Sequence, residues 1–184
     1  MLSHREVGKH TGGFGRALRS AVRQDADVVL VGELRDCETI GLAITAAEMG
    51  LLVFGTLHTN NAAKTIDRVI DAFPADEQNQ VRLSLSESLA AVVSQLLLPT
   101  LDGKGRIALH EILLRTSGLP NVIREGNTSM LHSLIQAGKS VGMQAMDDVL
   151  FEAVKARRVL PADAYAKADN KARFEPSLAG TARA

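Results

Sequence analysis

Residues 25–36 read DADVVLVGELRD, an apolar run that ends in a cluster of charges. The run Val28–Val31 is rich in β-branched residues and too short for a helix, so it predicts a strand buried on both faces. Asp36 is placed to cap a following helix, and Gly50 to end that helix. Residues 51–57, LLVFGTL, predict a second buried strand. Strand, helix and strand in so short a span predict a βαβ unit with parallel strands and a right-handed crossover.

Polar side chains follow both predicted strands. Glu33 and Arg35 come after the first strand, and His58 and Thr59 come after the second. Parallel strands end at the same edge of a sheet, where open α/β proteins bind ligands, so we expect these residues to share a site. A carboxylate there suits the ordering of magnesium and water in a P-loop NTPase. Two alternatives stay open: Glu33 caps the next helix or pairs with Arg35, and His58 is an ordinary histidine at a strand end.

The remainder of the chain shows helical patterns, one further strand and no internal repeat. The predicted helices are a segment around 14–22, one that Asn60 or Asn61 caps and that ends near Pro74, a long one over 76–96, and short ones around 121–124, 130–137 and 145–156. Residues 106–114 predict a third strand after a turn at 101–105. From Ala166 onward the chain is rich in alanine and polar residues, so we expect this tail to fray.

Composition excludes several classes of protein. The 184 residues contain 21 Lys and Arg against 21 Asp and Glu, a balance that argues against a dedicated nucleic-acid or membrane-surface protein. Cys37 is the single cysteine, which excludes an internal disulfide and a cysteine-based zinc site and favours a reducing cytoplasm. The chain lacks a signal-peptide pattern and a membrane-spanning run, so we expect it to be soluble.

A phosphate loop of the form G-x-x-x-x-G-K-[S/T] is missing from the sequence. The nearest match is SLIQAGKS at residues 133–140, which has Ser133 in place of the first glycine and follows residues with helical spacing. Gly138 is therefore better interpreted as the end of a helix. The sequence carries the later half of an NTPase site without the phosphate loop.

Six segments together resemble the type IV pilus retraction ATPases of the secretion ATPase superfamily. They are REVGKHTGGFGRALRSAVRQDADVVLVGELRD (5–36), AAEMGLLVFGTLHTNNAAKTIDRVIDAFP (46–74), LSESLAAVVSQLLL (85–98), GRIALHEILL (105–114), NVIREGN (121–127) and GMQAMD (142–147). The resemblance implies an α/β fold: an incomplete RecA-like P-loop NTPase core over residues 1–116, with a parallel sheet and flanking helices, and a small C-terminal helical subdomain and tail over 117–184. The family's N-terminal domain, phosphate loop and acidic box do not occur in these 184 residues, so we expect the chain to be the C-terminal portion of a longer motor.

The resemblance also implies roles for individual residues. VVLVGELRD is similar to the Walker B segment, so Glu33 would organise magnesium and the attacking water. GTLHTNNAAKTIDR is similar to the histidine box, so His58 would sense the terminal phosphate or the neighbouring subunit. The residues implied as further support for the nucleotide site are Gly32, Arg35, Thr56 and Thr59.

The segment 117–127 matches the family's retraction motif. The residues implied there are Asn121, Ile123, Arg124 and Glu125. Pro120 occupies a position where the family usually has arginine, which puts part of the motif's function in question. Arg124 and Glu125 also fit a solvated helix end.

The function implied by the resemblance is the C-terminal part of a hexameric motor that couples ATP hydrolysis to pilus disassembly and twitching motility. The motor would be cytoplasmic and peripheral to the inner membrane at the pilus base. Its partners would be an inner-membrane platform protein and related pilus motor ATPases, without direct nucleic-acid binding. The complete protein would use ATP and Mg²⁺, whereas this chain alone would bind ATP weakly or not at all, because a phosphate loop supplies most of the donors to the phosphates. Catalysis by this chain alone is left open, and the alternative is a truncated, non-catalytic assembly or interaction module.

Overall fold

A computed structural model describes residues 2–181. These residues form two compact units, and the chain passes between them repeatedly. Unit 1 consists of residues 2–58, 65–89 and 119–128, and unit 2 of residues 59–64, 90–118 and 129–181. The predicted domains 1–116 and 117–184 stay a prediction, because the two units group packed segments and do not define domains of a longer protein.

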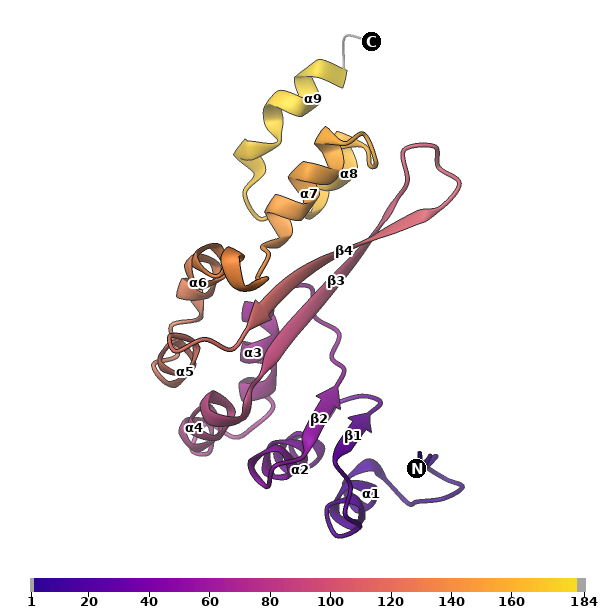
Figure 1. Ribbon diagram of the computed structural model, residues 1–184, viewed down its shortest axis with the longest axis vertical. Coiled ribbons are helices and arrows are strands. Elements are labelled where there is room, and N and C mark those ends of the chain that lie inside the picture. Colours follow the sequence, from indigo (N-terminus) through magenta and orange to yellow (C-terminus); the bar gives the residue numbers. More distant parts are fainter. Residues whose placement is uncertain (1, 182–184) are drawn as a thin grey trace. The chain divides into compact units, whose positions relative to one another are not determined.

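Unit 1 is built from helices around a small sheet. Its elements are α1 (Phe14–Ala21), β1 (Val28–Val31), α2 (Cys37–Glu48), β2 (Leu52–Gly55), most of α3 (Ala62–Asp71), α4 (Gln78–Ser88) and α5 (Leu119–Arg124). β1 pairs with β2 in parallel, as predicted, and the register places Val28 opposite Leu52 and Val31 opposite Gly55. The predicted helix between the strands is α2 (Figure 1).

The two-stranded sheet buries one face only. Val31 packs with Leu18 of α1 and Ala43 of α2 in the core of unit 1. On the other face Leu30 is 72% exposed and Phe54, its partner in register, is 53% exposed. The predictions that the first strand is buried on both faces and that the second strand is buried are therefore wrong for this chain. The apolar residues are present on both faces, as in a doubly covered sheet, but nothing within the described residues covers the second face.

Unit 2 is organised around a long antiparallel ribbon. Its elements are β3 (Ala91–Pro99), β4 (Arg106–Leu114), α6 (Leu131–Ala137), α7 (Met146–Lys155), α8 (Pro161–Lys167), α9 (Glu175–Thr181), the 3₁₀ turns Lys139–Val141 and Lys171–Arg173, and most of the 3₁₀ turn Thr128–Met130. β3 pairs with β4 from Ala91 opposite Leu114 to Pro99 opposite Arg106 (Figure 1). The third predicted strand has the predicted bounds, but it belongs to this ribbon and not to the parallel sheet.

The predicted long helix over 76–96 is wrong beyond Ser88. α4 ends there, and the chain continues as β3. The apolar residues of this stretch fit a helical spacing, yet Val92 and Leu98 also lie on one face of an alternating strand, both buried. Pairing with β4 satisfies the backbone along the whole strand, so tertiary context overrides the local helical pattern.

The expected fraying of the tail is also wrong as far as Phe174. α8 and α9 follow α7, and Phe174 is fully buried in the same core as Leu150 and Val159. Its ring meets the ring of Phe151 edge to face, with centroids 5.9 Å apart. Residues 182–184 of the predicted tail lie outside the described residues.

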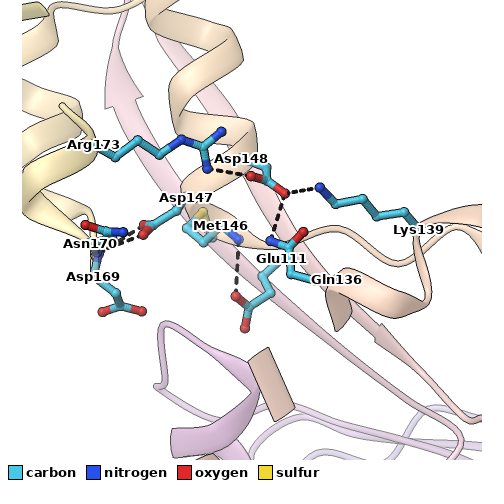
Figure 2. Close-up of polar contacts among 9 residues, drawn as sticks. All are labelled: Glu111, Gln136, Lys139, Met146, Asp147, Asp148, Asp169, Asn170 and Arg173. Carbon is cyan, nitrogen blue, oxygen red and sulfur yellow. Dashed lines mark hydrogen bonds and ion pairs between the residues drawn. The ribbon is translucent and has the colours of Figure 1, made fainter. Parts of the chain in front are cut away.

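Two consecutive aspartates at the start of α7 fasten this C-terminal segment (Figure 2). The Asp147 carboxylate accepts hydrogen bonds from the backbone N–H groups of Asp169, at 3.0 Å, and Asn170, at 2.8 Å. The Asp148 carboxylate pairs with Arg173 at 2.5 Å and with Lys139 at 2.7 Å. Although burial alone would raise the pKa of Asp148, these cations and Gln136 hold it well below its usual range. The C-terminal segment is thus held by charge as well as by the Phe174 ring.

Among residues 2–181, no helix combines the length and the apolar character that a membrane span requires.

Candidate functional site

The loops that follow β1 and β2 are tied to one another. The N–H of Leu34 donates to the Thr56 carbonyl at 3.0 Å, and the Thr56 hydroxyl donates to the Gly32 carbonyl. Gly55 makes room for this arrangement, because a Cβ at that position would lie 2.5 Å from Cδ1 of Leu34. The two strand ends therefore continue side by side, and the residue between Gly32 and Leu34 is Glu33.

Glu33 joins the two strand ends through its carboxylate. One oxygen, Oε2, lies 2.5 Å from Nη2 of Arg35, and the other, Oε1, lies 2.9 Å from Nε2 of His58. The Glu33 side chain is 22% exposed, whereas those of Arg35 and His58 are 71% and 89% exposed. The carboxylate is thus partly sheltered and flanked by two solvent-facing nitrogen groups. The predicted meeting of Glu33, Arg35 and His58 at one sheet edge is present in the structure.

Of the two alternatives for Glu33, the structure contains the ion pair and not the helix cap. Asp36 caps α2, since its Oδ1 accepts the Thr39 N–H at 2.8 Å, as predicted. Asn61, one of the two asparagines proposed to cap α3, accepts the Lys64 N–H at 2.8 Å. Glu33 is consequently not used as a helix cap.

The hydrogen bond from Arg35 is the largest cause that lowers the pKa of Glu33 below its ordinary value of 4.5, and His58 lowers it further. We expect Arg35→Ala to raise this pKa toward 4.5, and His58→Ala to raise it less. Because the folded-state pKa is the depressed one, the ion pair stabilises the fold above pH 4.5, and this contribution is lost as the pH falls through the lowered pKa. An NMR titration of the Glu33 carboxyl measures the effect. A titration midpoint that Arg35→Ala leaves unchanged would contradict the assigned cause.

The remaining residues predicted for the site are only partly brought together. Gly32 and Thr56 hold the two loops, as described above, and act on Glu33 through the backbone. Thr59 belongs to unit 2 and is half-buried. Thr59 is therefore not assigned to the group around Glu33, although it has an interaction partner.

The residues of the predicted retraction motif lie on and just after α5, which packs against α4 in unit 1. Ile123 is fully buried, whereas Asn121, Arg124 and Glu125 are exposed. Pro120 is the second residue of α5, where the missing N–H costs no intrahelical hydrogen bond. The substitution that put the motif in question is therefore compatible with its helix.

The sequence did not lead us to predict the buried acid Glu111. Glu111 of β4 is 7% exposed, and its two carboxylate oxygens accept the N–H groups of Ala62 at 2.7 Å and Met146 at 3.2 Å. The alternating pattern of RIALHEILL could have revealed it, because Glu111 occupies a position on the same buried face of the strand as Leu109 and Leu113.

The Glu33 carboxylate fits a magnesium–nucleotide site. Mg²⁺ prefers oxygen ligands and is commonly held by one or two carboxylates together with substrate phosphates and water. The single carboxylate at this sheet edge would supply the protein's oxygen ligand to Mg²⁺, either directly or through a bound water. Within residues 2–181, no group of three or more His, Cys, Asp or Glu side chains forms a metal site of its own.

The chain matches a known protein family. Residues 7–106 match the model of the Type II/IV secretion system protein family. This range includes the segments that carry Glu33 and His58.

Individual relatives extend the match over most of the chain. A twitching motility protein from Neisseria gonorrhoeae is 53% identical over 170 residues, which are 92% of this chain and 46% of the relative. A type IV pilus retraction ATPase from Pseudomonas aeruginosa is 56% identical over 147 residues, covering 80% of this chain and 42% of the relative.

A solved structure of similar fold is that of the pilus retraction motor PilT with bound ADP. It superposes with a TM-score of 0.84 at 42% identity, over 95% of this chain and 49% of the other. The agreement confirms the predicted α/β fold class and the resemblance to pilus retraction ATPases. The chain spans about half the length of these relatives.

Proposed function

Because the chain belongs to the Type II/IV secretion system protein family, we propose that it supplies the Walker B and histidine-box part of the ATP-hydrolysing site in a type IV pilus retraction motor. The observation that carries this proposal is the Glu33 carboxylate, held between Arg35 and His58 where two parallel strands end. The similarity to a retraction motor solved with ADP supports the choice of nucleotide.

Glu33 acts on the attacking water in this proposal. A carboxylate that is kept ionised can accept a hydrogen bond from water and orient it for in-line attack on a phosphoryl group. Glu33 is ionised at neutral pH, since Arg35 lowers its pKa further below the ordinary value, and Arg35 also fixes one of its oxygens. His58 fixes the other oxygen and, being exposed, is free to respond to the terminal phosphate or to a neighbouring subunit. Mg²⁺, when bound beside Glu33, would stabilise the negative charge on the phosphate oxygens.

The donors for the phosphates come from elsewhere in this proposal, since the chain has no phosphate loop. We propose weak or no ATP binding by the chain alone and full activity only in a longer hexameric ATPase. Its partners would be an inner-membrane platform protein and related pilus motors at the pilus base. The exposed Asn121, Arg124 and Glu125 of the retraction motif are suited to contact other proteins there, while Ile123 anchors α5.

A second candidate function, a non-catalytic assembly module, is favoured by the uncovered face of the small sheet. The exposed apolar residues on that face are Val28, Leu30, Leu52 and Phe54. Large exposed apolar patches commonly mark surfaces that another polypeptide covers. A complete motor would cover the same face, so ATP hydrolysis is the property that distinguishes the two functions.

A hybrid protein tests the proposed function in cells. In this hybrid the chain replaces the matching 46% of the gonococcal twitching motility protein. We expect the hybrid to restore twitching to gonococci that lack their own twitching motility protein, measured as spreading at colony edges. The relative with the matching segment deleted is the control and should restore nothing. If the hybrid protein accumulates in the cells and hydrolyses ATP but the cells stay non-motile, the retraction role is contradicted and the ATPase role is kept.

A further inference from the structure

In unit 2, one buried carboxylate accepts hydrogen bonds from two residues that each begin a helix. Glu111 Oε1 accepts the N–H of Ala62, where α3 begins, and Oε2 accepts the N–H of Met146, where α7 begins (Figure 2 shows the second bond). The two donors, Ala62 and Met146, both belong to unit 2 and are 84 positions apart in the sequence. A single side chain thus links these two residues.

Each helix start benefits from this carboxylate. The first N–H groups of a helix have no partner within the helix, and the positive end of the helix dipole favours a negative charge. The residue before α7 is Ala145, whose methyl side chain cannot accept a hydrogen bond. Glu111 therefore takes the place of an N-cap for α7, and it adds to the Asn61 cap at α3.

Glu111 lies beside buried apolar side chains, where a carboxylate is unfavourable without hydrogen bonds. It lies on the buried face of the β3–β4 ribbon beside Leu109 and Leu113, which are 3% and 0% exposed. Burying a carboxylate in apolar surroundings is unfavourable unless hydrogen bonds compensate. Its cross-strand partner Ser94 is also buried, and the Ser94 hydroxyl has no hydrogen-bond partner within the described part of the chain. The compensation seen for Glu111 comes from the two helix amides.

We propose that Glu111 is a positioning residue that fixes residues 59–64, the part of the histidine-box segment that belongs to unit 2, to the start of α7. Ala62 lies in this part, four residues after His58, and donates its N–H to Glu111. Because α7 uses the other oxygen of the same carboxylate, a displacement of the α7 start is transmitted to this segment. This inference rests on the proposed function for the role of His58, but the linkage itself needs no nucleotide.

Backbone amide exchange followed by NMR on the chain tests the linkage. In Glu111→Ala we expect the amides of Ala62 and Met146 both to exchange about tenfold faster, because both lose their acceptor. In Glu111→Gln the side-chain amide keeps one acceptor oxygen and turns its NH₂ group toward the other donor. We therefore expect only one of the two amides, that of Met146 with the longer bond, to lose protection. The His58 imidazole signal is expected to shift in Glu111→Ala.

The matched control is Glu152→Gln, which changes an exposed glutamate of α7 and should leave both amides and the His58 signal unaltered. Protection kept at either amide in Glu111→Ala, or at both in Glu111→Gln, would overturn the linkage. Faster exchange with an unmoved His58 signal would overturn the positioning role. If Glu111→Ala does not fold, the isosteric Glu111→Gln decides the question. All these readings are made without ATP, so a failure of the proposed ATPase function would leave them unaffected.

Discussion

In the hybrid protein, Glu33→Gln is expected to lower the rate of ATP hydrolysis about a thousandfold while ATP stays bound. Glutamine keeps the size of the side chain and one oxygen acceptor, so the sheet edge should keep its structure. It loses the negative charge that orients water, and its NH₂ group cannot accept a hydrogen bond from Arg35 or His58. The loss should therefore appear in kcat, with little change in nucleotide affinity.

The control for this variant is Glu48→Gln, which replaces an exposed glutamate at the end of α2. Phosphate release at saturating ATP and binding of a fluorescent nucleotide measure turnover and affinity separately. If Glu33→Gln hydrolyses ATP at a rate close to that of the unchanged hybrid, Glu33 is a surface ion-pair partner and not a catalytic residue.

The second large effect is expected from Phe174→Ala, which should destabilise unit 2 by about 3–5 kcal/mol. The Phe174 side chain is fully buried and packs edge to face on Phe151, so alanine leaves a cavity that the surrounding helices cannot fill. Tyr165 is the only tyrosine and tryptophan is absent, so intrinsic fluorescence in urea follows the unfolding of unit 2.

Phe14→Ala provides the comparison, because Phe14 is 39% exposed in α1 of unit 1. Its effect on the Tyr165 transition should be small. A change below about 1 kcal/mol for Phe174→Ala would mean that the C-terminal segment does not contribute to the core.

The sequence predicted most of the part of the fold that carries Glu33. Val28–Val31, the Asp36 cap and Gly50 are local signals, and each has the expected structure; Gly50 adopts φ +98° just beyond α2. The shared edge of the two strands then follows from the handedness and direction of a βαβ unit. The proximity of Glu33 and His58 at one sheet edge was predictable because it depends on this local topology.

The errors arose where distant segments determine the structure. The stretch after Ser88 fits both helical and alternating patterns, and pairing of β3 with β4 selects the strand. Phe174 stands in a polar, alanine-rich tail, and its burial depends on α7 and on the aspartates that fasten residues 169–173. Gly55 is needed because Leu34 lies against it, which no local pattern reveals.

Steady-state ATP hydrolysis by the purified hybrid in the presence of Mg²⁺, with the chain alone assayed beside it, decides whether the chain contributes to an ATPase site. We expect turnover by the hybrid and none by the chain alone, because the chain supplies Glu33 and His58 while the phosphate loop comes from the relative. A folded hybrid that binds ATP without hydrolysing it would rule out the catalytic role and favour the non-catalytic assembly module.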